Sequence, residues 1–126
     1  MNNTKSFKDL IVWQKAYVLT KEVYALTLSF PKEEVYGLSS QMRRAAVSIT
    51  SNIAEGFGRQ GYKEKIQFYY LAQGSLTELK NQIITAKDVG YLSKEDFQNL
   101  INQANMSHKL LQGLITKSKT FLNLKS

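Results

Sequence analysis

Residues 62–89 read YKEKIQFYYLAQGSLTELKNQIITAKDV, and the apolar residues of this stretch recur at steps of three and four. This spacing places them along one face of an α-helix. That face is buried when it packs against other helices. The positions are Ile66, Tyr69, Ala72, Leu76, Leu79, Ile83 and Ala86. Gly90 follows directly, and a glycine just past a helix readily takes the left-handed conformation that ends it. The stretch therefore predicts a helix from about Tyr62 to Val89.

Three further segments with the same spacing lie around this one. The first opens at Ser6–Asp9, which resembles a capping box, and stops at Pro31, because the residue before a proline avoids helical geometry. The second runs from about Leu38 into the glycine-rich stretch 56–61, and the fourth begins after Ser93. Strict alternation of apolar and polar residues, which marks strands, is absent. The pattern predicts an all-α fold, an antiparallel up-and-down four-helix bundle in a single domain over residues 1–126.

The same periodicity predicts which side chains form the core. Residues at the centre of each apolar stripe should be mostly buried, because that face of each helix turns toward the others. The expected core residues are Trp13, Met42, Ile49, Ile53, Leu76, Leu79, Ile83, Leu100 and Leu111.

The composition limits the class of protein. The chain has 126 residues, 43% of them hydrophobic, and 17 Lys and Arg against 10 Asp and Glu give a formal net charge of +7. The absence of cysteine excludes disulfides and thiolate metal sites. The first residues lead into no apolar signal segment, and no apolar run approaches the roughly 18 residues of a membrane span. We expect a cytoplasmic protein without a membrane partner, whose positive field attracts polyanions such as nucleic acid.

Motifs that would indicate catalysis are weak. Residues 56–61, GFGRQG, match G-x-G-x-x-G, but a dinucleotide site needs a strand before the motif, and here a helix precedes it. A glycine-rich turn between two helices is the better interpretation. The single histidine, His108, has no His or Cys partner for a metal and nothing to orient it as a base. We predict no catalytic residue, no metal and no cofactor.

A polar stripe follows the second predicted helix beside its apolar face, at steps of three and four residues. One interpretation is a solvated face. We favour a buried or interface stripe, because exposed helix faces usually carry more Lys and Glu. Its residues are Arg44, Ser48, Asn52 and Glu55, with Tyr69 on the next helix as a further interface candidate. Gly74 and Ser75 in the third helix suggest close packing too, since glycine inside a helix costs stability without it.

Basic residues gather in two places that suit nucleic acid. Arg59, Lys63 and Lys65 surround the glycine-rich turn, and Lys117 and Lys119 lie in a C-terminal stretch where no acid follows Asp96. Lysines in a last helical turn also complement the helix dipole, so part of this signal is structural. Tyrosines beside the lysines could stack on bases, although core and subunit packing are commoner uses of tyrosine.

Six stretches resemble the 23S rRNA intervening-sequence proteins, a bacterial four-helix-bundle family. They are FKDLxxWQxA from Phe7, FPxxExxGL from Phe30, QxRRA from Gln41, VSIxSNIAEG from Val47, AxGSLxEL from Ala72 and GYL from Gly90. The resemblance covers nearly the whole chain. It implies a bundle that assembles into a ring of five, encoded within insertions in large-subunit rRNA genes or elsewhere in the genome. It supplies no catalytic residues.

A more distant resemblance in fold and charge links the chain to the accessory proteins of diversity-generating retroelements. Those form basic pentamers that bind nucleic acid and a reverse transcriptase. We therefore expect a non-enzymatic homo-oligomer, a pentamer, that binds RNA or DNA, preferably RNA, with low sequence specificity. The alternative is a protein–protein interaction scaffold that binds no nucleic acid and whose charge serves solubility.

Overall fold

The computed structural model describes residues 4–125, and side chains for residues 4–124. Four α-helices make up most of this part of the chain, and no strand occurs within it. The helices are α1 (Ile11–Thr27), α2 (Leu38–Gly58), α3 (Tyr62–Asp88) and α4 (Lys94–Lys125), with short 3-10 turns at Phe7–Asp9 and Lys32–Glu34. The predicted all-α fold is confirmed.

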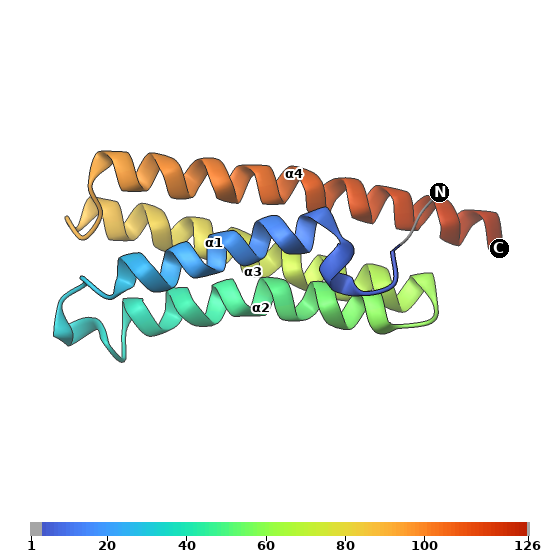
Figure 1. The fold of residues 1–126 in the computed structure, drawn as a ribbon, viewed down its shortest axis with the longest axis horizontal. Helices are drawn as coiled ribbons and strands as arrows, with labels where there is room; N and C mark the ends of the chain where they lie inside the picture. Colours follow the sequence, from blue (N-terminus) through green and yellow to red (C-terminus); the bar gives the residue numbers. More distant parts are fainter. Residues whose placement is uncertain (1–3, 126) are drawn as a thin grey trace.

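The four helices lie side by side along one long axis (Figure 1). Each helix begins at the end of the bundle where the previous one finishes, so successive helices run in opposite directions in this view. α1 and α3 each lie directly beside α2 and α4, whereas the backbones of the diagonal pairs lie further apart within the described residues. The C-terminal end of α4 projects beyond the turn between α2 and α3 (Figure 1).

Local sequence signals set most of the helix ends. Gly90 takes a positive φ of 89°, and beyond it the amide of Tyr91 donates to the carbonyl of Ala86 at 2.8 Å, which ends α3 as predicted. Ser93 accepts a hydrogen bond from the amide of Asp96 at 3.0 Å and so caps the start of α4.

The start of the first helix differs from the prediction. Ser6 and Asp9 do form a capping box, but it closes the 3-10 turn at Phe7–Asp9 rather than α1. Leu10 is extended, with ψ of 125°, so the chain changes direction before α1 begins at Ile11. A capping box satisfies the amides of any helical turn, so the motif alone did not reveal how short this turn is.

The predicted core is confirmed with one partial exception. All of the predicted core residues except Trp13 are at most 1% exposed, and they belong to one continuous cluster in the centre of the bundle. Trp13 is half-buried at the edge of that cluster. Its ring stacks on Tyr17, with centroids 4.8 Å apart, and meets the ring of Phe7 edge-on. This indole therefore covers the core beside the N-terminal turn.

Two helical glycines have opposite surroundings. Gly56 is buried in the last turn of α2, where a Cβ would lie 2.6 Å from Cε1 of Tyr69. Gly74 in α3 is exposed, and a Cβ there would meet no atom within 4 Å. Within the described residues of one chain, therefore, nothing packs closely on Gly74, and close packing there stays a prediction for a contact between subunits. Close approach occurs instead at Gly56, where the α2 backbone lies against the tyrosine ring.

Candidate nucleic-acid interface

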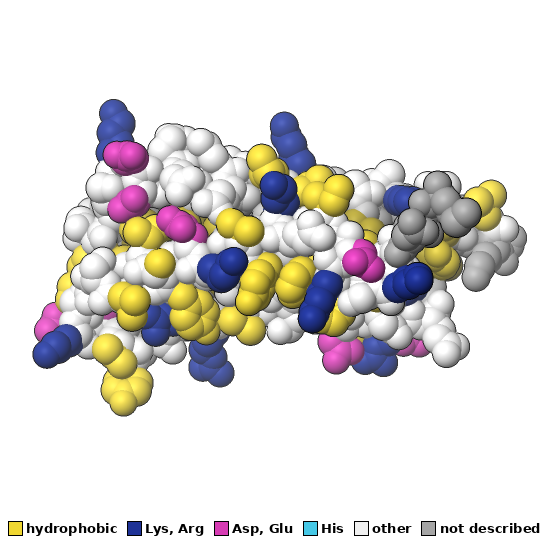
Figure 2. Space-filling view, in the orientation of Figure 1, with side chains coloured by type: hydrophobic (Ala, Val, Ile, Leu, Met, Phe, Trp, Pro, Cys, Tyr) yellow, Lys and Arg dark blue, Asp and Glu magenta, His cyan; other side chains and the backbone are white. Residues whose placement is uncertain are grey.

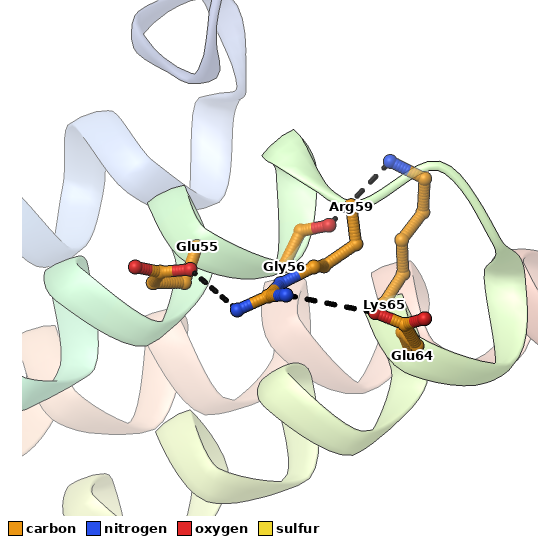
Figure 3. A network of polar contacts seen from close by, with 5 residues as sticks. All are labelled: Glu55, Gly56, Arg59, Glu64 and Lys65. Carbon is orange, nitrogen blue, oxygen red and sulfur yellow. Dashed lines mark hydrogen bonds and ion pairs between the residues drawn. The ribbon is translucent and has the colours of Figure 1, made fainter.

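The turn between α2 and α3 holds Arg59 in a network of charges (Figure 3). The guanidinium lies between two carboxylates, with Nη2 at 3.2 Å from Glu55 and Nη1 at 3.7 Å from Glu64. It also lies over the ring of Phe68, 4.6 Å from the centroid. All three charged side chains are exposed, so each pair stabilises the fold by only about 0–1 kcal/mol. Two acids therefore balance the charge of Arg59 within the described chain, and its role as a phosphate ligand stays a prediction.

Lys65 is occupied by the end of the preceding helix. Its Nζ donates to the carbonyl oxygens of Phe57 at 2.6 Å and Gly56 at 3.4 Å, which belong to the last turn of α2 (Figure 3 shows Gly56). A lysine in this place satisfies carbonyls that have no partner within the helix. Partial burial lowers the pKa of the ammonium. Lys65 therefore joins α3 to the end of α2, a structural role that the charge pattern did not reveal.

The other three predicted lysines are exposed. Lys117 lies over the ring of Phe121, 6.0 Å from its centroid, and Lys119 lies over that of Tyr70 at 5.0 Å. Lys63 forms no salt bridge with any residue that the structure describes. These side chains keep their charge available for an external anion.

Aromatic contacts bring the two basic segments together. Tyr62, next to Lys63, stacks on Phe121, with ring centroids 5.2 Å apart and planes 27° apart. The start of α3 and the C-terminal part of α4 thus lie side by side, although nearly sixty positions separate them in the chain. We call the exposed region over these two segments the basic–aromatic face. Its residues are Tyr62, Lys63, Tyr70, Lys117, Lys119 and Phe121.

The predicted polar stripe divides into two parts. Ser48 and Asn52 are partly buried, and the Ser48 hydroxyl lies 2.8 Å from that of Ser75, which links α2 to α3. The Asn52 amide donates to the Ser48 carbonyl at 2.9 Å and to its hydroxyl at 3.1 Å. Arg44 and Glu55 are exposed. Within one chain, then, the buried part of the stripe fixes the contact of two helices.

Three polar contacts between elements have no clear sequence signal. Nε of Arg43 donates to the Thr27 hydroxyl at 2.8 Å and so ties α2 to α1. The Tyr91 hydroxyl donates to Glu34 at 2.8 Å, and the pKa of that carboxyl is lowered, first by its bond from the Leu38 amide and then by Tyr91. These contacts join residues 16 and 57 positions apart, so local periodicity could not predict them.

The single histidine forms the third of these contacts. Nδ1 of His108 on α4 lies 2.8 Å from Nζ of Lys80 on α3. Burial, and then the charge of Lys80, lower the pKa of the imidazole, so it accepts this hydrogen bond as the neutral ring. Among residues 4–124, no group of three or more His, Cys, Asp or Glu side chains could hold a metal ion. In the same range, no helix has the length and hydrophobicity to cross a membrane.

The fold and this surface define a class: a four-helix bundle with exposed lysines set among aromatic rings. Residues 8–113 match the family described as 23S rRNA-intervening sequence protein. The match spans most of the sequence, and the chain belongs to that family. No curated protein matches it significantly.

A solved structure supports the fold independently. The chain is similar to a protein with unknown function from the S23 ribosomal protein family of Bacteroides thetaiotaomicron VPI-5482. The two share 20% sequence identity with a TM-score of 0.75, over 83% of this chain and 98% of the other. At this identity the likeness is one of fold alone.

Proposed function

We propose that this chain is a non-enzymatic, homo-oligomeric basic bundle that binds nucleic acid, preferably RNA, with low sequence specificity. The observation that carries the proposal is the basic–aromatic face. Lys63, Lys117 and Lys119 are exposed there, and α4 contributes no acid after Asp96. Exposed lysines that lack acidic partners bind phosphates with little dependence on sequence. The family's description refers to 23S rRNA, which directs the proposal to RNA rather than DNA.

Self-association belongs to the same proposal. Large apolar side chains are exposed on and between α1 and α2, and hydrophobic side chains gather over these two helices in Figure 2. They include Tyr24, Leu28, Val35, Tyr36 and Val47. Exposed apolar patches of this kind mark surfaces that contact other proteins. Five chains of +7 would carry +35, and repetition around a ring would multiply each phosphate contact.

The same apolar surface favours the alternative function, a protein–protein interaction scaffold that binds no nucleic acid. In that case a partner protein would cover the exposed side chains of α1 and α2, and the positive charge would serve solubility. The two functions differ in one observable: only the first predicts retention of RNA that weakens as salt rises.

The oligomer is tested by mass in solution. Light scattering at micromolar protein should give several times the 14.4 kDa of one chain, and five times for a pentamer. The physical reason is the apolar area on α1 and α2, which association would remove from water. A single species at the monomer mass would overturn the homo-oligomer and the ring together.

The nucleic-acid proposal is tested by reversing three charges. The variant Lys63→Glu, Lys117→Glu, Lys119→Glu should weaken binding of a labelled RNA at least about tenfold at roughly 50 mM salt. Each lost phosphate contact should also reduce the slope of log affinity against log salt by about 0.7–0.9. Fluorescence anisotropy between about 50 and 200 mM salt measures both effects.

A matched control separates position from total charge. Lys21, Lys32 and Lys94 are also exposed, and their replacement by glutamate changes the net charge equally. This control should retain most of the affinity, because its lysines lie outside the basic–aromatic face. Equal weakening in both variants would mean that net charge alone attracts RNA. No binding by the unaltered protein at low salt, to single strands or duplex, would leave the scaffold as the better function.

A further inference from the structure

A cavity of about 530 Å³ opens at the end of the bundle where the N-terminal segment meets α3 and α4. Its walls are mainly aliphatic and aromatic, and they include Leu10, Leu114, Tyr62 and Phe121. The stacked pair of Tyr62 and Phe121 is shared with the basic–aromatic face, so the cavity and that face adjoin. This volume lies in the range of sites that hold small organic groups, roughly 300–1,000 Å³.

One polar group in the wall has no partner. Tyr69 lines the cavity and is only 2% exposed, yet its hydroxyl forms no hydrogen bond with any residue from 4 to 124. Burial, and then the nearby Tyr62, raise the pKa of this hydroxyl to about 12, so it stays protonated and can donate at neutral pH. Contact with Gly56 holds the ring on its other side. The ring is buried, but the hydroxyl keeps contact with solvent through the open cavity, so a bound group can take the place of water as its hydrogen-bond partner.

The charges around the cavity favour an anion. Lys117 lines it, and Lys65 lines it with at most one N–H left after its two bonds to α2 carbonyls. Of the described residues in the wall, only Asp9 is acidic. Its carboxylate already accepts from the backbone amides of Lys5 and Ser6, at 2.9 and 3.1 Å. The cavity thus combines an aromatic wall, a free donor and two cations.

We propose that this cavity holds one unstacked base of a single-stranded RNA bound along the basic–aromatic face. The inference rests on the proposed function and names its substrate class. The Tyr69 hydroxyl bonds the edge of the base, Phe121 stacks on it, and Lys117 lies beside its phosphate. An alkyl chain would fill the same volume but leave the hydroxyl without a partner. A base within a duplex is stacked and paired, so it cannot enter without being flipped out.

Two substitutions in the full-length protein test the inference. Tyr69→Phe removes only the hydroxyl and keeps the ring that packs on Gly56. It should weaken binding of a labelled oligouridylate by roughly 2- to 10-fold. Phe121→Leu removes the stacking surface and should weaken it by roughly 5- to 100-fold. Binding of an RNA duplex of equal length should change less than about twofold, because duplex contacts rest on phosphates alone.

The control is Val89→Ala, which alters an apolar residue that is 55% exposed at the C-terminal end of α3, away from the cavity at the start of that helix. It should leave both affinities unchanged, and circular dichroism melts establish that each variant is folded. Equal weakening of single strand and duplex, or no weakening by Tyr69→Phe and Phe121→Leu, would overturn the base-binding cavity while the proposed function stands. If the unaltered protein bound neither the single strand nor the duplex, the base-binding cavity and the proposed function would both be wrong. If uridine monophosphate competed at micromolar concentration, the cavity would be a site for a free nucleotide, and the proposal that it holds a base of an RNA strand would be wrong.

Discussion

Replacement of Ile83 by alanine should lower the free energy of unfolding by about 2–5 kcal/mol. Ile83 is fully buried in the central cluster, at 0% exposure, and is surrounded by side chains from the other helices. Truncation removes apolar surface that folding buries and leaves a cavity that the close-packed core cannot fully close. Urea unfolding at one fixed protein concentration measures the change, since self-association makes apparent stability depend on concentration.

The next residue provides the matched control. Ile84 has the same side chain on the same helix but is 46% exposed. Ile84→Ala should cost less than about 1 kcal/mol, because its side chain leaves water only in part. The pair thus isolates burial from helix propensity and residue type. Similar losses for the two variants would show that the orientation of α3 in the bundle is wrong.

The two helical glycines should respond to alanine with opposite signs. At Gly56 the added methyl group would lie 2.6 Å from Cε1 of Tyr69, a ring that is itself buried. Overpacking of this kind costs about 1–3 kcal/mol, which outweighs the gain in helix propensity near the end of α2. At Gly74 the methyl group meets nothing within 4 Å, so Gly74→Ala should stabilise the protein by about 1 kcal/mol.

Thermal or urea unfolding of both glycine variants measures this difference in sign. A third variant, Gly56→Ala with Tyr69→Leu, tests the cause, because removal of the ring should recover part of the loss. Stabilisation by Gly56→Ala alone would mean that α2 and α3 lie further apart than the structure shows. Destabilisation by Gly74→Ala, together with a lower mass in light scattering, would place Gly74 at a contact between subunits.

The candidate site could be predicted only in part. Lys63, Lys117 and Lys119 were predicted from the clustering of positive charge along the chain, and their side chains are exposed. Arg59 and Lys65 were predicted from the same clustering of positive charge. However, Arg59 lies between two carboxylates, and Lys65 caps the C-terminal end of α2. The partners of a charged side chain depend on which atoms lie near it in space. A count of charges along the chain therefore cannot separate a free lysine from a structural one.

The sequence by itself determined the four helices and the core, because both follow from spacing within a few residues. Apolar steps of three and four place Leu76, Leu79 and Ile83 on one face whatever packs against it. Gly90 likewise ends α3 through its own backbone conformation, whatever packs against the helix. Only the tertiary structure decided that Phe121 meets Tyr62 and that Tyr69 lines a cavity. Those contacts depend on how far α4 extends past the start of α3, which the packing of the whole bundle sets.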